Sequence, residues 1–387
     1  MVDVKLWLIL ERKMMKVLQI TSHLNVGGIT RYVLALSKQL MERGHQIIIA
    51  ADNGSLQEQV TQHGFTYCHL PLHTSAEFSP QVFWGIHHLS KQLEKEPVDV
   101  IHAHTRVAQV VADRISRQFQ IPYVTTWHGV YTPRWGRRLW PCTGDLTIAI
   151  SGLVRQHLIH DFRIPEERVR LVYNGIDFAY YSTLPEGSVI ANYRRQWQIL
   201  QGRPVIGGIG RLAAGRVKGF DTLLAAVHLL KETLPEIQVL IVGDGPRMPF
   251  LEDVVRRLGI RDQVHFVGTA QDIRIALALM DLFIFTSRWP EAFGLTVVEA
   301  MAAGKMVIAT QVGAVPEIIR HGLDGWIIPS DDPVVLAECV RRFLTDRKTV
   351  QEFGRQAQMR VAEAFSLDRM ASEIEKVYRE ALGKSEC

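Results

Sequence analysis

Two glutamates, Glu291 and Glu299, have seven residues between them and are the clearest chemical signal in the chain. The apolar run 282–285 before them is typical of a buried parallel strand, and the apolar residues within 297–302 predict a helix that Gly304 ends. We therefore expect Glu291 on a loop at the carboxyl end of a strand and Glu299 about one turn into the next helix. Carboxylates repel phosphate, so this pair suits hydroxyl groups, such as those of the sugars on either side of a diphosphate. The alternative is a glycine loop with two surface glutamates.

Groups that attract anions are expected beside these glutamates. Ligands of open α/β sheets bind at the carboxyl ends of the strands, and the first amides of a helix attract phosphate. The amides that we expect to be free belong to Phe293, Gly294, Leu295 and Thr296. Arg211 and Lys218 flank one strand-to-helix loop, where two cations would neutralise a diphosphate. The alternative is a pair of solvated surface charges.

Further glycines end other predicted strands. Gly27 and Gly28 follow the strand 16–20, where a backbone can approach phosphate closely. A nicotinamide enzyme is disfavoured, because GxGxxG is absent and no acidic residue ends the predicted second strand, 46–50, in the place that would hold a ribose. Later in the chain, Gly243 ends a strand, and backbone groups between Gly268 and Asp272 are placed to pair with a base edge; Asp272 is also a predicted helix cap.

Three histidines end strands in the first half. We expect His102 and His104 to point to opposite faces, so that at most one faces a cleft and a metal site would need further ligands. Hydrogen-bonding histidines at the rim of a cleft are the favoured interpretation. His128 ends the strand 122–126 and precedes a glycine, which suits donation to a sugar hydroxyl or a position opposite phosphate. The alternative for His128 is a structural loop residue.

The segment 131–140 alternates arginines with aromatic residues, among them Arg134, Trp135, Arg137 and Arg138. This pattern is typical of a contact with an anionic membrane surface or an acceptor, and equally of a loop packed on its own domain. Nucleic acid is a weaker candidate, because no basic stripe runs through the rest of the chain.

Strands and helices alternate in both halves of the 387 residues, which predicts an α/β protein of two domains. We place the connection within 178–201, where periodicity is weak. The expected organisation is an N-terminal Rossmann-like domain in residues 1–185, a second in residues 186–365, and a C-terminal helical segment in residues 366–387.

Composition narrows the class of protein. A hydrophobic fraction of 47% and a charged fraction of 22% are typical of a globular protein. The four cysteines show no disulfide or CxxC spacing, so we expect a reducing cytoplasm. The apolar run 4–10 is too short to span a membrane. Met15 precedes a clean strand, so we expect residues 1–14 to be an upstream extension.

The motifs together resemble the retaining glycosyltransferases of family 4, which have the GT-B fold. The resemblance runs from about Lys16 to the C-terminus and depends on the order of six weak motifs. These are Gly27-Gly28, His128-Gly129, Asn174-Gly-Ile-Asp177, Gly210-Arg211 with Lys218-Gly219, Gly243-Asp-Gly-Pro246, and Glu291-x7-Glu299. The resemblance implies two Rossmann-like domains with parallel sheets facing across a cleft, the first for the acceptor and the second for a nucleotide-sugar, and a last helix that returns to the first domain.

The resemblance also implies roles for individual residues. Arg211 and Lys218 would hold the donor diphosphate, Glu299 the ribose, and Glu291 the transferred sugar. The amides of residues 293–295 would support the phosphates. Gly28 would lie against the diphosphate, and His128 near the reacting carbon. The loop between Arg211 and Lys218 is longer than the family usually shows, so Arg216 competes with Lys218 as the phosphate cation.

The expected reaction is transfer of a sugar from a UDP- or GDP-type donor to an acceptor hydroxyl with retention, without metal or other cofactor. Cell-envelope glycolipid or surface polysaccharide is the expected product, made in the cytoplasm or at the inner face of the cell membrane. Two alternatives stay open: a sugar-nucleotide epimerase or phosphorylase of the same fold, and a non-catalytic nucleotide-sugar binder.

Overall fold

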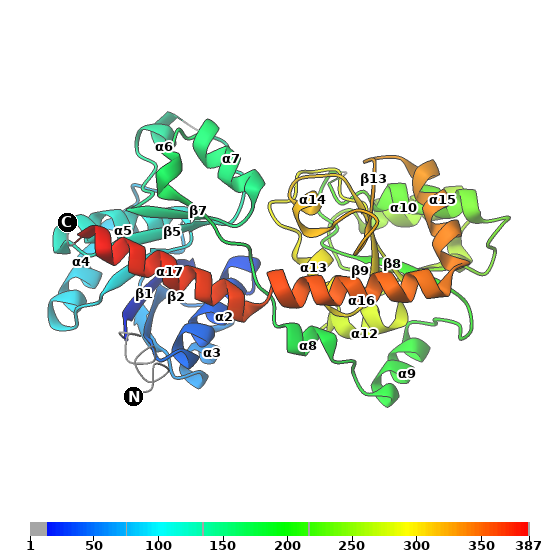
Figure 1. The fold of residues 1–387 in the computed structure, drawn as a ribbon, viewed down its shortest axis with the longest axis horizontal. Helices are drawn as coiled ribbons and strands as arrows, with labels where there is room; N and C mark the ends of the chain where they lie inside the picture. The colour runs from blue at the N-terminus through cyan, green and yellow to red at the C-terminus, as the bar shows by residue number, and fades with distance from the viewer. Residues whose placement is uncertain (1–13, 75, 134, 216, 386–387) are drawn as a thin grey trace, which may run out of the picture. The chain divides into compact units, whose positions relative to one another are not determined.

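The computed structural model describes residues 14–74, 76–133, 135–215 and 217–385. The chain packs as two compact units, one formed by residues up to Asn174 together with the segment from Leu367, and the other by Gly175–Ser366 (Figure 1). Each unit is described here by itself. The predicted upstream extension lies, apart from Met14, outside the described residues.

The first unit is built on a parallel sheet of seven strands in the order β3-β2-β1-β4-β5-β6-β7. Its strands are β1 (Lys16–His23), β2 (Gln46–Asp52), β3 (Thr66–His69), β4 (Val100–Ala103), β5 (Tyr123–Trp127), β6 (Leu146–Ala149) and β7 (Val169–Leu171). Its helices are α2 (Gly28–Glu42), α3 (Gln57–Gln62), α4 (Pro80–Lys95), α5 (Arg106–Phe119), α6 (Trp135–Leu139), α7 (Gly152–His160), α17 (Leu367–Ser385) and the 3₁₀ turn Glu166–Arg168.

The second unit contains a parallel sheet of six strands in the order β10-β9-β8-β11-β12-β13. Its strands are β8 (Val205–Ile209), β9 (Gln238–Val242), β10 (Val264–Phe266), β11 (Leu282–Phe285), β12 (Met306–Thr310) and β13 (Trp326–Ile328). Its helices are α8 (Phe178–Ser182), α9 (Gly187–Gln196), α10 (Phe220–Leu230), α11 (Met248–Leu258), α12 (Ile273–Leu279), α13 (Leu295–Ala302), α14 (Val315–Ile318), α15 (Pro333–Leu344), α16 (Arg347–Ala364) and the 3₁₀ turn Arg261–Gln263.

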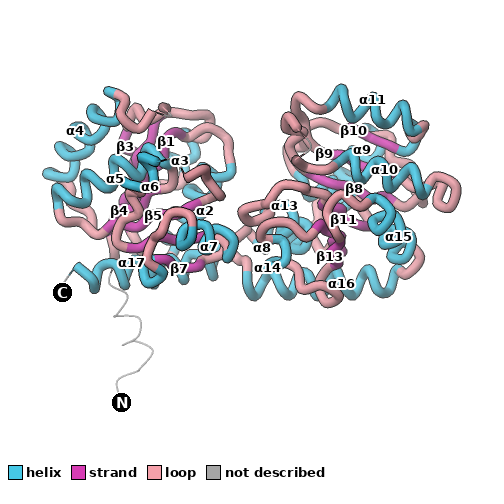
Figure 2. The backbone as a smooth tube through the Cα atoms, turned by 90° about the horizontal axis from the view of Figure 1, so that it is seen from above, coloured by secondary structure: helices cyan, strands magenta, loops and turns pink. Residues whose placement is uncertain are grey.

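Both sheets lie inside their units, with helices on the outside (Figure 2). Strands such as β9, β11 and β12 are buried along their whole length, which explains why they read as unbroken apolar runs in the sequence. The strand order reverses between β1 and β4 in one sheet and between β8 and β11 in the other. Ligands of such sheets bind outside the carboxyl ends of the strands at this reversal.

Two helices after the first sheet belong to the second unit. Helix α8 packs on α13 and α16, and α9 packs on α12. Arg274 holds α8 in place, because its guanidinium lies 3.6 Å from the centre of the Tyr180 ring and donates to the backbone oxygens of Tyr180 and Thr183. The sequence-based division had assigned residues 178–182 to the first domain (1–185), whereas the compact units divide after Asn174.

Helix α17 packs on α2 and completes the core of the first unit. Its apolar face buries Met370, Ala371, Ile374 and Tyr378 against the sheet core. Arg43 of the α2 C-terminus bonds Asp368 and Glu375, which fixes the start of α17 beside α2. Within the described residues, no helix is both long and apolar enough to cross a membrane.

Candidate active site

The predicted donor-binding residues of the second unit follow four strands of one parallel sheet. Arg211 follows β8, Gly243 follows β9, Gly268 follows β10 and Glu291 follows β11. Because all these strands are parallel, their carboxyl ends share one edge of the sheet. The order reversal between β8 and β11 puts the Arg211 and Glu291 loops next to one another at that edge.

Lys218 and Glu291 form an ion pair with each other. The Lys218 ammonium contacts Glu291 Oε1, and Ser287 Oγ lies 3.1 Å from the same oxygen. The backbone of the loop that carries Lys218 is hydrogen-bonded to the loop after β11, since Arg288 N donates to Val217 O at 2.8 Å. A Cβ on Gly219 would lie 1.9 Å from Thr286 O, so only glycine permits this approach. The fold therefore brings Lys218 and Glu291 into contact at the carboxyl edge of the sheet.

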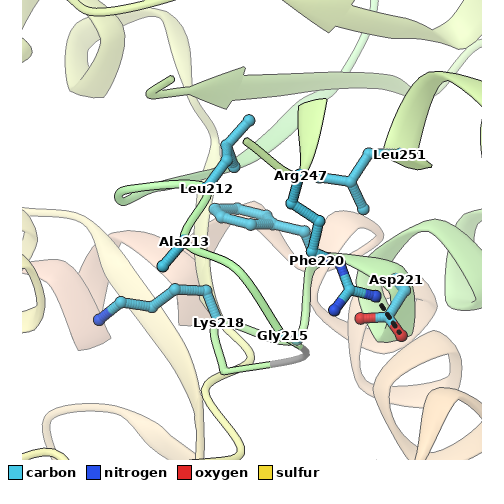
Figure 3. A pocket seen from close by; sticks show the side chains of 9 residues that line it. Leu212, Ala213, Gly215, Lys218, Phe220, Asp221, Arg247 and Leu251 are labelled. Carbon is cyan, nitrogen blue, oxygen red and sulfur yellow. Dashed lines mark ion pairs between the residues drawn. The ribbon is translucent and has the colours of Figure 1, made fainter. Parts of the chain in front are cut away.

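Neighbouring arginines of the same unit are already neutralised. Arg288 and Arg247 both pair with Asp221, at 2.8 Å and 3.7 Å. Figure 3 shows the Lys218 side chain extending away from the Arg247–Asp221 pair. Among the described residues Arg211 forms no ion pair, and its side chain is exposed. Arg211 thus remains available for an anion. Arg216, the residue expected to compete with Lys218 as the phosphate cation, lies outside the described residues.

Helix α13 presents its N-terminus without a side-chain cap. Its N-cap is Gly294, which has φ 106°, and in the described part of the chain no side chain accepts from the first amides. Phe293 is buried and packs edge-on against Phe365, with ring centroids 5.8 Å apart. Val297 N donates to Gly294 O at 3.0 Å, whereas the amides of Leu295 and Thr296 meet no acceptor among the described residues. Such a terminus is a ready anion site.

Glu299 lies in α13 and accepts a hydrogen bond from the hydroxyl of Tyr181, at 2.9 Å. Sequence reasoning missed Tyr181, because it sits on the short helix α8, where the pattern shows little periodicity. The available signal was its position shortly after the turn motif Asn174-Gly-Ile-Asp177. One oxygen of the Glu299 carboxylate is therefore oriented from α8.

The remaining predicted donor residues have structural partners. Asp272 caps α12 by accepting from Arg274 N at 2.9 Å and also pairs with the Arg274 guanidinium. Burial raises the pKa of Asp272, but the hydrogen bonds from Arg274 outweigh this and lower it overall. Gly243 donates to Gly268 O at 2.8 Å, which joins the loops after β9 and β10.

In the first unit, the predicted residues again lie at the carboxyl edge of a sheet. Gly27 is the N-cap of α2, and in the described part of the chain no side chain caps that helix. A Cβ on Gly28 would meet nothing within 4 Å, so the protein's own packing does not require glycine there. His128 follows β5 and is partly exposed. Burial lowers its pKa to about 3, which favours the neutral form of the ring.

The expectation that His102 and His104 face opposite sides is wrong. Their ring centroids lie 4.1 Å apart, and His104 in turn contacts His128. The reason is the period of two along a strand, which places residues i and i+2 on the same face. Within the described residues, no group of three or more histidine, cysteine, aspartate or glutamate side chains is arranged to hold a metal ion.

In the arginine and tryptophan segment 131–140, some side chains pack on their own unit and others are exposed to solvent. The Arg137 guanidinium lies 4.8 Å from the Tyr131 ring centre, and Arg138 Nε donates to Asp161 O at 3.1 Å, so both are held by their own unit. Trp135 and Leu139 of α6 are 80% and 72% exposed. Arg134 lies outside the described residues.

Comparison with known proteins identifies two family models along the chain. Residues 26–180 match the model described as Glycosyltransferase Family 4, and residues 189–360 match Glycosyl transferases group 1. One relative is N-acetyl-alpha-D-glucosaminyl L-malate synthase of Bacillus anthracis, 26% identical over 94% of this chain and 96% of that protein. Another is the lipopolysaccharide core biosynthesis mannosyltransferase LpsB of Rhizobium meliloti, 28% identical over 76% of this chain and 83% of that protein.

Solved structures show the same fold over nearly the whole chain. A glycosyltransferase from Rickettsia africae superposes with a TM-score of 0.87 at 22% identity, covering 96% of this chain and 99% of that one. Anabaena Alr3699/HepE, solved with UDP and glucose, superposes with a TM-score of 0.78 at 24% identity, covering 94% and 99%. The two family models together account for most of the sequence, and the protein belongs to glycosyltransferase family 4, with the GT-B architecture of two Rossmann-like domains.

Proposed function

We propose that this glycosyltransferase transfers a hexose from a nucleoside diphosphate to an acceptor hydroxyl with retention of the anomeric configuration. The observation that carries the proposal is one sheet edge on which Arg211 is exposed, Lys218 pairs with Glu291, and α13 presents an uncapped N-terminus. Cations and free amides suit a diphosphate, and carboxylates suit hydroxyl groups. Since HepE was solved with UDP and UDP-glucose, a UDP-type donor is the first choice and a GDP-type donor the second.

In this proposal the donor replaces the Lys218–Glu291 ion pair. The diphosphate takes the ammonium of Lys218, and a hydroxyl of the transferred sugar donates to the released carboxylate of Glu291. Ser287 stays within reach of Glu291 and limits the movement of that carboxylate. Each charge therefore exchanges one partner for another, and none is left uncompensated in a partly buried site.

The chemical step breaks the bond between the sugar and the diphosphate, and negative charge grows on the leaving group. Arg211, Lys218 and the amides of α13 are proposed to stabilise that charge. No carboxylate of the second unit is proposed as a nucleophile, because Glu291 and Glu299 are assigned to hydroxyl groups. The acceptor hydroxyl attacks the anomeric carbon from the face on which the phosphate leaves, and it gives its proton to that phosphate, which accounts for retention.

We also propose that this chemistry needs no metal ion. Support comes from the two cations, which can neutralise the two charges of a diphosphate without help. Turnover should be unchanged by EDTA. Loss of turnover in EDTA that is restored by Mg²⁺ or Mn²⁺ would overturn this part of the proposal.

A glycan or glycolipid acceptor at an anionic membrane is proposed from the exposed Trp135 and Leu139 and from relatives named for lipopolysaccharide synthesis. The double variant Trp135→Ser, Leu139→Ser should lose co-sedimentation with vesicles containing anionic lipid. The control is Leu229→Ser, which removes an exposed apolar side chain of the second unit. Equal sedimentation of both variants would remove membrane contact from the proposal.

The function itself is tested by a thermal-shift screen of UDP, GDP and their sugars, followed by product analysis. A ligand at 100 times its Kd should stabilise the fold by about 2.7 kcal/mol. Nucleotide release that requires an acceptor, with the product anomer matching the donor, supports the transferase. Release without acceptor, or release driven by inorganic phosphate, would indicate an epimerase or a phosphorylase, and binding without any turnover a simple binder.

A further inference from the structure

A continuous chain of polar side chains runs through the interior of the first unit and ends at His128. Tyr378 of α17 accepts from Gln19 Nε2 at 3.1 Å, and Gln19 Oε1 lies 2.6 Å from His104 Nε2. His104 Nδ1 in turn lies 3.3 Å from His128 Nε2. Four elements, α17, β1, the end of β4 and the end of β5, thus contribute one link each.

A branch of this hydrogen-bonded series leads from Tyr378 to His102 and Thr126. The Tyr378 hydroxyl lies 2.7 Å from His102 Nδ1, and His102 Nε2 lies 2.7 Å from Thr126 Oγ1. Gln19, His102 and Tyr378 are fully buried, and His104 is 1% exposed. Water therefore cannot replace a missing partner at these positions, and each donor must meet an acceptor.

All three histidines are held neutral. Burial lowers the pKa of His102, His104 and His128 well below the usual value. The His128 ring further disfavours a charge on His102 and on His104, and the His102 ring disfavours one on His104. A neutral imidazole carries one proton, so one nitrogen donates and the other accepts. The direction of the hydrogen bonds then decides which nitrogen carries the proton.

The direction follows from Gln19. An amide oxygen only accepts, so His104 must donate through Nε2 to Gln19 Oε1, which leaves His104 Nδ1 without a proton. The bond between His104 and His128 then requires His128 to donate through Nε2. On the other side, Tyr378 accepts from Gln19 and donates to His102, which donates to Thr126. His102 and His104 then each have one donating and one accepting nitrogen.

We propose that Tyr378, Gln19 and His104 are positioning residues that hold His128 in the tautomer with the proton on Nε2 and a bare Nδ1. The histidine is then an acceptor for a substrate hydroxyl, and not a donor or a cation. In this arrangement the C-terminal helix α17 takes part in the chemistry of the first unit through one buried hydroxyl. The role of the bare nitrogen toward a sugar hydroxyl rests on the proposed function; the tautomer does not.

The tautomer is read directly by long-range ¹H–¹⁵N correlation spectra of the full-length protein labelled with ¹⁵N-histidine. We expect His128, assigned by loss of its signals in His128→Asn, to show a protonated Nε2 and a bare Nδ1, unchanged from pH 6 to pH 9. Gln19→Leu removes the acceptor of His104 and should give averaged nitrogen shifts at His128. Tyr378→Phe is a milder change that removes the hydroxyl group orienting the Gln19 amide. It should give the same averaged nitrogen shifts at His128.

The matched control is Gln109→Leu, the same substitution at another buried glutamine. In the described structure Gln109 forms no hydrogen bond with Tyr378, Gln19, His104 or His128. The Gln109→Leu variant should keep the wild-type spectrum. A proton on His128 Nδ1 in the wild type, or an unchanged spectrum in both Gln19→Leu and Tyr378→Phe, would overturn the proposal.

Kinetics link the tautomer to the reaction. Turnover of Gln19→Leu should fall about tenfold, the value of one hydrogen bond, with little change in the KM of the donor. Nucleotide binding measured on the same samples reports on the second unit. A correct tautomer without nucleotide binding would therefore count against the proposed function alone, and nucleotide binding with the wrong tautomer against this inference alone.

Discussion

The two candidate groups of residues solve different electrostatic problems. In the second unit, Lys218, Glu291 and Arg211 are charged and lie in reach of solvent at a sheet edge. In the first unit, His104 and its neighbours are buried and neutral, and their order depends on hydrogen bonds. Charges that remain hydrated can exchange partners at low cost, whereas a buried polar chain admits few arrangements. We infer that the first group is suited to capturing an anionic ligand and the second to holding one proton in a fixed place.

The largest expected effect comes from the exposed cation. Arg211→Ala should reduce kcat/KM by about 3 kcal/mol, or more than a hundredfold, because it removes charge stabilisation of the leaving group. The control Arg257→Ala removes an exposed arginine of α11 that pairs with Asp253 and should leave the rate unchanged. Near-normal rates for Arg211→Ala with an unchanged melting curve would contradict the role assigned to the charged residues of the second unit.

The buried side of the comparison is tested by acid. The pKa values of His102 and His104 are lowered in the folded chain, so between the unfolded value near 6.5 and the folded values the unfolded state binds more protons. The stabilising contribution is complete above pH 6.5 and is lost as the pH falls, at about 1.4 kcal/mol per pH unit for each histidine. Urea unfolding at pH 7 and pH 5 measures this slope.

A matched pair of variants sharpens that measurement. His104→Asn should reduce the slope by about one histidine's share, whereas His228→Asn, at an exposed position of α10, should leave it as in the wild type. Equal slopes for both variants would mean that the buried histidines do not govern the acid sensitivity.

A smaller effect is expected from the partner exchange at Glu291. Glu291→Gln keeps the size of the side chain but removes the ion pair with Lys218. The KM of the donor should rise and kcat should fall, with a combined loss of about 2 kcal/mol, since a charged hydrogen bond is replaced by a neutral one. Steady-state kinetics with varied donor give both terms. An unchanged kcat/KM would remove Glu291 from the site.

The smallest effect is expected from Tyr181. Tyr181→Phe removes the hydroxyl that donates to Glu299 and should weaken UDP binding by about 1 kcal/mol, roughly fivefold. The same variant should bind 2′,3′-dideoxy-UDP as well as the wild type does. A similar loss with both nucleotides would show that Tyr181 supports the fold, and that it does not orient Glu299 toward a ribose.

Much of the fold could be predicted because the two sheets are parallel and buried. Runs such as 237–242 and 282–285 have no polar face, so composition alone marks them as strands. Strand β13 was missed, because three residues after a turn give no periodic signal. Helices α8 and α9 were read as a connection, because neither α8 nor α9 has a buried residue that would mark a core face.

The site could be predicted only in part. Residues at strand ends were identified from glycines and charges, since local sequence controls those turns. The pairing of Lys218 with Glu291 joins residues far apart in the chain, and the contact of His104 with Gln19 depends on the order of the strands. No local pattern encodes such contacts. The shared face of His102 and His104 follows from the strand period of two, which the expectation of opposite faces did not take into account.

The central claim is that the second unit binds a diphosphate, and calorimetric titration with UDP, UMP, GDP and GMP tests it most directly. For the preferred base, the wild type should bind the diphosphate about a hundredfold more tightly than the monophosphate, the value of one or two charge-assisted hydrogen bonds. In Arg211→Ala most of that difference should vanish. Equal affinity of the wild type for diphosphate and monophosphate, with both bases, would contradict the account.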